Sequence, residues 1–275
     1  MQTMRKQMIG AIACLAVSLS LASSTMAANN GDSFDVYVNG EAITATYGQQ
    51  ISGGTTYVCY LPVIQAVYPE ATAVWKGGKV TITADGLTMT INPSAKYLEC
   101  NGRCFYASTG FKMVNEALLV PAGVLAQALG GTAVWFDSTT LYITADDTPI
   151  ASGDKTYSSD DLFWLSRIIF AESGNQSLEG KIAVGNVVLN RVGDSRFPNT
   201  VYDVIFQKNQ FTPVANKSIN RTPSEEAVAA AKLCLEGINT AGNSLYFVNS
   251  SVSPNSWASR ARPYVATIGA HTFFA

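Results

Sequence analysis

An internal repeat in the first half of the chain is the sequence feature that most constrains the fold. Thr-Ala-Val-Trp occurs at 72–75 and again at 132–135, and Ile-Thr-Ala-Asp occurs at 82–85 and again at 143–146. The same motifs in the same order indicate one structural unit that is used twice. We therefore predict a duplicated domain over residues 34–146.

Each copy of the repeat contains the same predicted elements. A helix-like segment opened by a proline lies at 61–68 and again at 120–130, where Gly130-Gly131 closes it in the manner of a C-cap. Apolar and polar residues alternate at 79–84 and at 141–145, which is the pattern of short strands. The predicted unit is a strand, a short helix and a hairpin.

This half resembles a known domain family. Leu-Val-Pro at 119–121, followed by Ala-Leu-Gly-Gly and Val-Trp-Phe-Asp within 128–137, is similar to the copper amine oxidase N-terminal-like stalk domain of secreted bacterial proteins. The resemblance implies a spacer or a module that contacts wall polymer or protein. It implies no copper, because copper sites draw on imidazole and the chain's one histidine, His271, lies in the other half. Trp75 and Trp135 are expected to be buried in their hairpins rather than to stack on sugars.

A polar segment separates the two halves. Residues 147–157 carry Pro, Gly, Ser and charge without hydrophobic periodicity, as linkers do. Ser158 then begins Ser-Ser-Asp-Asp, a helix start of the capping-box type, and apolar residues at helical spacing follow as far as Glu172. We predict a second domain over 158–275.

The second domain is predicted to be mainly helical with a small sheet. A second helix spans about 178–191, a third begins near Thr200, and a fourth begins with Thr222 as its cap. Strands are expected at 244–249 and 271–274. Helices followed by a small sheet make the chain α+β.

Glu172 is the residue best placed for chemistry. It lies in the run Ile-Ile-Phe-Ala-Glu-Ser at 168–173, where the amphipathic helix gives way to a polar turn. A carboxylic acid held against apolar neighbours has a raised pKa and can donate a proton near neutral pH. Cleavage of a glycosidic bond requires such a donor.

The same region resembles the catalytic domain of the spore-cortex-lytic, or cell wall hydrolase, family. The motifs that carry the resemblance are Glu172, Glu-Gly at 179–180, Val-Leu-Asn-Arg-Val at 188–192, Phe-Pro-Asn-Thr-Val at 197–201 and Ile-Gly-x-His-x-Phe at 268–273. The resemblance implies a lysozyme-like or lytic-transglycosylase-like fold that cleaves peptidoglycan. It also implies that Glu172 protonates the β-1,4 glycosidic oxygen between N-acetylmuramic acid and N-acetylglucosamine. The 6-hydroxyl of the muramic sugar then attacks, and one carboxyl serves as acid and afterwards as base.

The chain departs from the family pattern at one acidic position. Relatives commonly read Glu-Ala-Arg-Gly-Glu, whereas this chain has Gln176 in place of the second glutamate. Hydrolysis by two carboxylates through that position is therefore disfavoured. Glu179 is the remaining nearby acid; it is a possible second acid, although a structural role near the helix N-terminus or beside a base is favoured.

A sugar groove is expected to be lined by aromatic and amide side chains, since rings stack on pyranoses and amides bind hydroxyl and acetamido groups. Asn190 and Arg191 are expected to be structural instead, hydrogen-bonding the turn beyond their helix. The predicted substrate-binding residues are Gln210, Phe211, Tyr246, Asn249, Trp257 and His271.

Two other functions remain open from the sequence. One is hydrolysis of the peptide stem, as by an N-acetylmuramoyl-L-alanine amidase. A catalytic zinc site often uses several histidines, and the chain has one, so a zinc amidase is disfavoured. No metal or other cofactor is expected. Cys234 and His271 can be drawn as a nucleophile and a base, but Cys234 lies in an apolar helical run. The other alternative is a wall-binding protein without catalysis.

The N-terminus and the net charge bear on location and partners. Arg5 and Lys6 precede an apolar run and a small-residue site near Ala27, so residues 1–27 are predicted to be a signal peptide of a secreted wall protein without a permanent membrane anchor. Their removal leaves 16 basic and 20 acidic residues, a net charge of −4. Nucleic acid is thus excluded as a partner, and peptidoglycan glycan strands are expected instead.

Cys100 and Cys104 flank Asn-Gly-Arg and form a possible disulfide. A three-residue hairpin loop would place the thiols on the same face of two strands, whereas a two-residue Asn-Gly turn would place them on opposite faces. The sequence leaves both open.

Overall fold

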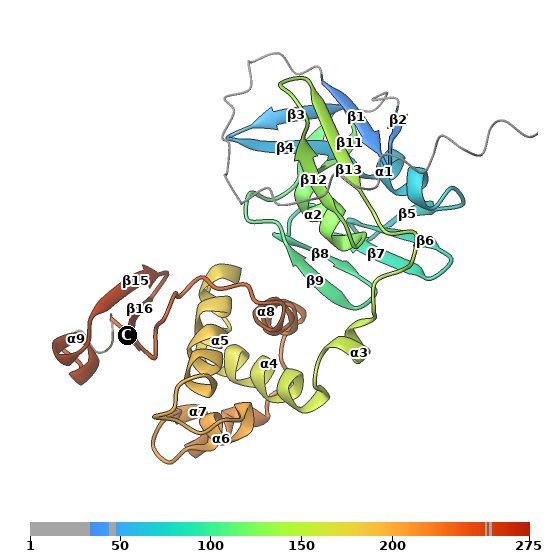
Figure 1. Cartoon of the computed structure of the whole chain (residues 1–275). Coiled ribbons are helices and arrows are strands. Elements are labelled where there is room, and N and C mark those ends of the chain that lie inside the picture. Colours follow the sequence, from blue (N-terminus) through green and yellow to red (C-terminus); the bar gives the residue numbers. More distant parts are fainter. Residues whose placement is uncertain (1–33, 44–47, 251, 253–254) are drawn as a thin grey trace, which may run out of the picture.

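The computed structural model describes residues 34–43, 48–250, 252 and 255–275. Figure 1 shows a strand-rich N-terminal domain and a mainly helical C-terminal domain, with the short helix α3 (Gly153–Thr156) between them. The predicted α+β class with two domains is confirmed. The predicted signal peptide lies outside the described residues. Within them, no helix has both the length and the apolar character needed to cross a bilayer.

The described strands of the N-terminal domain form three sheets. Their orders are β12-β13-β1-β2, β10-β11-β4-β3 and β5-β6-β7-β8-β9. Strand β1 runs parallel to β13, so the beginning and the end of this domain are paired. The strands are β1 (Asp35–Val38), β2 (Glu41–Ile43), β3 (Gln49–Ser52), β4 (Thr55–Cys59), β5 (Thr72–Lys76), β6 (Lys79–Ala84), β7 (Leu87–Ile91), β8 (Tyr97–Cys100), β9 (Arg103–Tyr106), β10 (Lys112–Val114), β11 (Ala117–Pro121), β12 (Thr132–Trp135) and β13 (Thr140–Thr144).

The two repeated segments have the same order of elements. Helix α1 (Tyr60–Val67) lies between β4 and the β5–β6 hairpin, and α2 (Ala122–Ala128) lies between β11 and the β12–β13 hairpin. The predicted C-cap of α2 is confirmed: Gly130 has a φ of +76°, and Gly131 donates to the carbonyl of Ala126. A side chain at Gly131 would overlap the carbonyl of Thr144, which explains the second glycine.

The two repeated tryptophans are more exposed than expected. Trp75 is 48% and Trp135 is 37% exposed. Their strands, β5 and β12, are edge strands of their sheets, and the side chains of Val74 and Val134 are also exposed. The expectation of buried tryptophans is therefore wrong, because an edge strand of a single sheet layer leaves a face uncovered.

Cys100 and Cys104 are both free, so the possible disulfide is not formed and the two-residue turn is the alternative that the structure contains. Strands β8 and β9 are joined by a two-residue turn in which Asn101 and Gly102 both have positive φ, so that Cys100 pairs with Arg103. The two thiols consequently point to opposite faces of the sheet. Cys100 packs in the core of the N-terminal domain, and Cys104 packs in the core that contains the helices.

The C-terminal domain packs helices beside a three-stranded sheet of order β14-β16-β15. Strand β15 and the short helices α7 and α9 were not predicted from the sequence. The elements are α4 (Ser159–Ser173), α5 (Leu178–Val192), α6 (Val201–Phe206), α7 (Thr212–Ala215), the 3₁₀-helix η1 (Ser218–Asn220), α8 (Glu225–Leu235), β14 (Tyr246–Asn249), α9 (Trp257–Ala261), β15 (Tyr264–Ile268) and β16 (His271–Phe274).

Side-chain caps set most of the helix starts. The hydroxyl of Ser158 accepts from the Asp161 amide, and the hydroxyl of Thr200 accepts from the Asp203 amide, so both predicted starts are confirmed. The predicted cap Thr222 is wrong. Ser224 caps α8 instead, because its hydroxyl accepts from the Ala227 amide.

Helices α4, α5 and α8 pack closely at Gly185. A methyl group on Gly185 would lie 2.6 Å from the sulfur of Cys234 and 2.8 Å from Cδ1 of Ile169. The absence of a side chain therefore allows three helices to meet. The end of α4, which carries Glu172, is held against this packed core.

The two domains meet through charged and aromatic contacts. Arg103 of β9 makes a bidentate ion pair with Glu236, with N–O distances of 2.7 and 2.6 Å, and the hydroxyl of Tyr157 also donates to Glu236. On α8, Lys232 pairs with Glu99 at 3.3 Å. The predicted linker is thus partly helical, and Tyr157 at its end is buried against the helical domain.

Candidate functional site

Glu172 lies in the last turn of α4, where the helix meets the turn before α5. Its neighbours Ile168 and Ile169 are fully buried, and Glu172 itself is half-buried. Burial raises the pKa of Glu172 to about 7, with no opposing charge or hydrogen bond from the described residues. The carboxyl therefore keeps its proton to a higher pH than an exposed glutamate does, so near neutral pH it can serve as a proton donor and, once ionised, as an acceptor.

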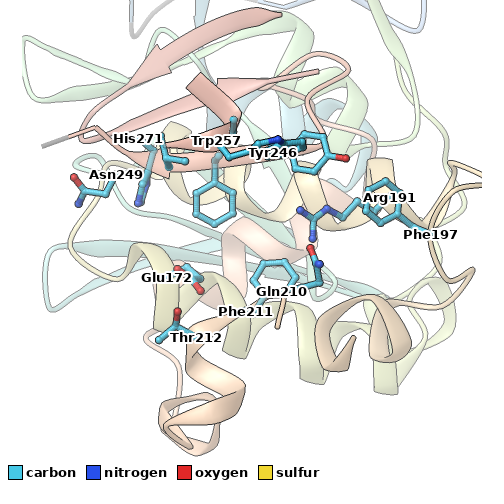
Figure 2. A pocket seen from close by; sticks show the side chains of 13 residues that line it. Glu172, Arg191, Phe197, Gln210, Phe211, Thr212, Tyr246, Asn249, Trp257 and His271 are labelled. Carbon is cyan, nitrogen blue, oxygen red and sulfur yellow. The ribbon is translucent and has the colours of Figure 1, made fainter. Parts of the chain in front are cut away.

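Glu172 borders a cavity of about 550 Å³ between the helices and the small sheet. Figure 2 shows Glu172 and Thr212 on one side of this cavity and side chains of β14 and β16 on the other. The structure brings all of the predicted catalytic and substrate-binding residues to this cavity except the possible second acid. These residues are Glu172, Gln210, Phe211, Tyr246, Asn249, Trp257 and His271.

The aromatic residues of the cavity differ in exposure. Phe211 is buried at the start of α7, whereas Trp257 at the start of α9 is 55% exposed and lies edge-on to Tyr246, with ring centroids 5.5 Å apart. Gln210 is exposed beside them. An exposed indole at the rim of a polar cavity has the arrangement needed to stack on a sugar ring.

His271 lies on β16, where it pairs with Asn249 of β14. Its ring is buried and packs edge-on against Phe247, with centroids 5.2 Å apart. Nδ1 has no hydrogen-bond partner among the described residues, and burial lowers the pKa of His271. The imidazole therefore stays neutral to a lower pH than an exposed histidine, and it can offer the cavity a neutral donor or acceptor.

Arg191 lines the cavity, although a purely structural role was expected for it from the sequence. Nε of Arg191 donates to the carbonyl of Leu245 at 2.7 Å, and Asn190 donates to the carbonyls of Gly242 and Ser244. Both side chains thus bind the segment before β14 rather than the turn beyond their helix. Arg191 also lines the cavity, as do Phe197 and Thr212, which were not predicted. An arginine at the buried end of a helix in a largely apolar run was the available signal.

Gln176 is not among the residues that line the cavity. Its Oε1 accepts from the Ala270 amide at 3.0 Å, which ties the turn after α4 to the β15–β16 turn. The buried ammonium of Lys181 holds the same turn, because it donates to the carbonyl of Gln176 and pairs with Glu226 at 2.7 Å. A carboxylate oxygen accepts such a hydrogen bond as well as an amide oxygen does, so a glutamate at this position could make the same contact.

Glu179 interacts with the N-terminal domain at the interface between the two domains. Its Oε1 lies 2.6 Å from Nζ of Lys96 and 3.2 Å from the hydroxyl of Tyr106, both in the N-terminal domain. Burial favours a raised pKa for Glu179, but the hydrogen bond from Lys96 and other contacts lower it below its usual value. Glu179 is not among the residues that line the cavity. The possible role of second acid is therefore not supported by its position.

Cys234 and His271 do not form a reactive pair. Cys234 is 3% exposed within α8, and its thiol contacts the carbonyl of Ile182 at 3.3 Å. Burial raises the pKa of Cys234 well above its usual range. The thiol is thus a core side chain. Among the described residues, no cluster of three or more His, Cys, Asp or Glu side chains could hold a metal ion.

Comparisons with known proteins assign a family to each domain. Residues 175–274 match the cell wall hydrolase family, and residues 37–157 match the copper amine oxidase N-terminal domain. The first match begins three residues after Glu172. The C-terminal part of the chain is therefore a cell wall hydrolase domain, and the N-terminal part is of the copper amine oxidase N-terminal type.

Several curated relatives are named spore cortex-lytic enzyme. The protein from Bacillus cereus is 38% identical over 117 residues, which cover 42% of this chain and 45% of the relative. The protein from Oceanobacillus iheyensis is 33% identical over 126 residues, which cover 46% of this chain and 45% of the relative. The chain thus spans about half the length of the curated relatives it matches.

Solved structures of two relatives also match. The catalytic domain of the germination-specific lytic transglycosylase SleB from Bacillus anthracis is 36% identical and is covered completely, with a TM-score of 0.41 over 46% of this chain. The catalytic domain of the Bacillus cereus SleB protein is 37% identical and is covered to 92%, with a TM-score of 0.41.

Proposed function

We propose that this protein cleaves the glycan strand of peptidoglycan at the β-1,4 bond between N-acetylmuramic acid and N-acetylglucosamine. The observation that carries the proposal is Glu172, a half-buried carboxyl with a pKa near 7 at a cavity lined by aromatic and amide side chains. The relatives named spore cortex-lytic enzyme and the B. anthracis lytic transglycosylase support the same class of reaction.

The reaction that fits this cavity uses one carboxyl twice. Protonated Glu172 donates its proton to the glycosidic oxygen, and the bond from that oxygen to C1 of the muramic sugar breaks. The 6-hydroxyl of the same sugar then bonds to C1, and its proton passes to the Glu172 carboxylate. The products are a 1,6-anhydro end and a free 4-hydroxyl, and Glu172 is again protonated.

Cleavage by two carboxylates has less support. Among the described residues that line the cavity, Glu172 is the one carboxylic acid. Inverting hydrolysis requires a second carboxylate roughly 6.5–9.5 Å away, and retaining hydrolysis one about 5 Å away. Glu179 is engaged with Lys96, and Gln176 is an amide.

We also propose that the protein is exported from the cell. A wall substrate requires an exported protein, which agrees with the predicted signal peptide at residues 1–27. The N-terminal domain then carries the catalytic domain, and its own contact with wall polymer or protein stays a prediction.

Product analysis tests the function. We expect the mature protein to release fragments with 1,6-anhydro ends from purified sacculi, and Glu172→Gln to release none while keeping its circular dichroism spectrum. New reducing ends would indicate hydrolysis, and freed peptide stems would indicate an amidase. A Glu172→Gln variant with undiminished cleavage would refute the assignment of the acid.

A further inference from the structure

Arg191 is a buried cation with no anionic partner in the part of the chain that the structure describes. Its side chain is 5% exposed, yet no described carboxylate lies within ion-pair distance of it. Nε is satisfied by the carbonyl of Leu245, but Nη1 has no hydrogen-bond partner among the described residues. Burial of an unpaired charge is costly, and buried arginines are normally paired.

Three aromatic rings surround the guanidinium. Its central carbon lies 5.0 Å from the ring centroid of Phe197, 5.3 Å from that of Phe211 and 5.4 Å from that of Tyr246. These rings hold the cation and exclude water, but a ring face supplies no acceptor oxygen to the N–H groups. Burial accordingly lowers the pKa of Arg191 to about 10, although the group stays charged at neutral pH.

A second arginine adds positive charge on the same aromatic ring. Arg262 lies 5.0 Å from the Tyr246 centroid, and its buried Nε also has no partner among the described residues. The neighbouring Arg196 differs, because Asp194 pairs with it at 2.7 Å. Arg262 also donates through Nη2 to the Tyr246 hydroxyl at 3.4 Å, but neither guanidinium has a carboxylate partner among the described residues. Arg191 therefore places a positive charge at this end of the cavity, and Arg262 adds a second one behind Tyr246.

We infer that Arg191 binds a carboxylate of the glycan substrate, with the anion held across the cavity from Glu172. Figure 2 shows the Arg191 guanidinium beside Gln210 and apart from the Glu172 carboxyl. The anion completes the hydrogen bonding of a guanidinium fork, whose geometry matches a carboxylate. A muramic residue without a stem peptide carries a free lactyl carboxylate, and a stem peptide carries carboxylates of its own, so either source supplies this chemistry. The inference rests on the proposed action on glycan strands, and it makes Arg191 a residue that selects acidic sugars.

Binding measurements in the Glu172→Gln background test the inference without turnover. Three oligosaccharides of equal length serve as probes: β-1,4-linked N-acetylglucosamine, an N-acetylglucosamine–N-acetylmuramic acid oligomer with free lactyl carboxylates, and the same oligomer with each lactyl carboxyl converted to a methylamide. A fourth probe with stem peptides distinguishes the two sources of carboxylate. We expect the best carboxylate probe to bind about ten- to a hundredfold tighter than the methylamide, as for a hydrogen bond between charged groups.

Variants then assign the preference to Arg191. Arg191→Gln should bind the carboxylate and methylamide probes within about threefold of each other. Arg221→Gln is the matched control, because Arg221 lies 5.1 Å from the Phe170 ring centroid but does not line the cavity. This control should keep the full preference.

Several results would overturn the inference. Equal binding of all probes by the Glu172→Gln protein that keeps Arg191 would overturn the inference. This measurement needs no arginine variant, so it decides the question even if Arg191→Gln fails to fold. A preference that persists in folded Arg191→Gln, or no binding of any carboxylate probe, has the same consequence. Failure of the proposed function is read separately, as the absence of fragments released from sacculi by the protein with Glu172.

Discussion

Replacing Glu172 by glutamine should stabilise the protein at alkaline pH while abolishing cleavage. Burial alone raises the pKa of this carboxyl, from 4.5 to about 7. A group with a raised pKa in the folded state contributes its full stability below pH 4.5, and this contribution is lost as the pH rises through 7. Glutamine has nearly the same shape and does not ionise.

The size of the effect follows from the shift. At 1.36 kcal/mol per pKa unit, ionising Glu172 in the folded protein costs at most about 3 kcal/mol, since the half-buried side chain keeps some contact with water. Guanidinium unfolding of both proteins at pH 4, 5.5, 7 and 9 measures it. The stability of Glu172→Gln relative to the original protein should rise between pH 4 and pH 9 by up to this amount. All other titrating groups are common to both proteins, so their contributions largely cancel in the difference between the two free energies of unfolding.

A stability difference that stays constant within about 0.5 kcal/mol across this pH range would refute the reasoning, because it would mean that the carboxyl is solvated. The same pKa sets the pH dependence of cleavage. The protonated acid is required, so the rate should fall as the pH rises above about 7. A rate that stays level to pH 9 would contradict protonation by Glu172.

Five further substitutions test the surrounding structure. Gly185→Ala should destabilise the helical domain by about 1–3 kcal/mol through overpacking, whereas Gly123→Ala, with open space around its Cβ, should stabilise by roughly 0.5–1 kcal/mol; thermal unfolding compares them. Gln176→Glu should leave cleavage within about threefold because the acceptor oxygen is kept, and Gln176→Ala should lower it by loosening the β15–β16 turn. Glu236→Gln should weaken the contact between the domains by about 1–3 kcal/mol, seen as earlier protease cleavage near Tyr157; an unchanged cleavage pattern would show that the domains dock without this ion pair.

Local features of the chain were predictable because they depend on residues close in sequence. The caps Ser158 and Thr200 hydrogen-bond amides three residues on, and the C-cap at Gly130 needs only a positive φ. The prediction of Thr222 as a cap was wrong for an equally local reason: Ser224, two residues later, offers an equivalent hydroxyl and caps the helix instead. Whether Cys100 and Cys104 could form a disulfide depended on whether the hairpin loop has two or three residues, because one residue more or less changes the face of the sheet to which a side chain points.

The chemistry of the site was only partly predictable. A glutamate at the end of an apolar helix indicated a proton donor, and aromatic and amide residues indicated a sugar groove. Glu179 was ambiguous because its partner Lys96 lies in the other domain, and Arg191 was taken as structural because its contacts to Leu245 and to the cavity come from a distant segment.

The amino-acid sequence by itself determined the longer helices, the repeated hairpins and the presence of an acid at a helix end, since these follow from hydrophobic period, capping and turn residues. The tertiary structure alone decided which charges are paired. It buried Glu172 so that its pKa rises, placed Lys96 beside Glu179, and buried Arg191 with no carboxylate partner among the described residues. The reason is that desolvation and Coulomb interactions depend on the distance in space between groups that the chain order keeps far apart.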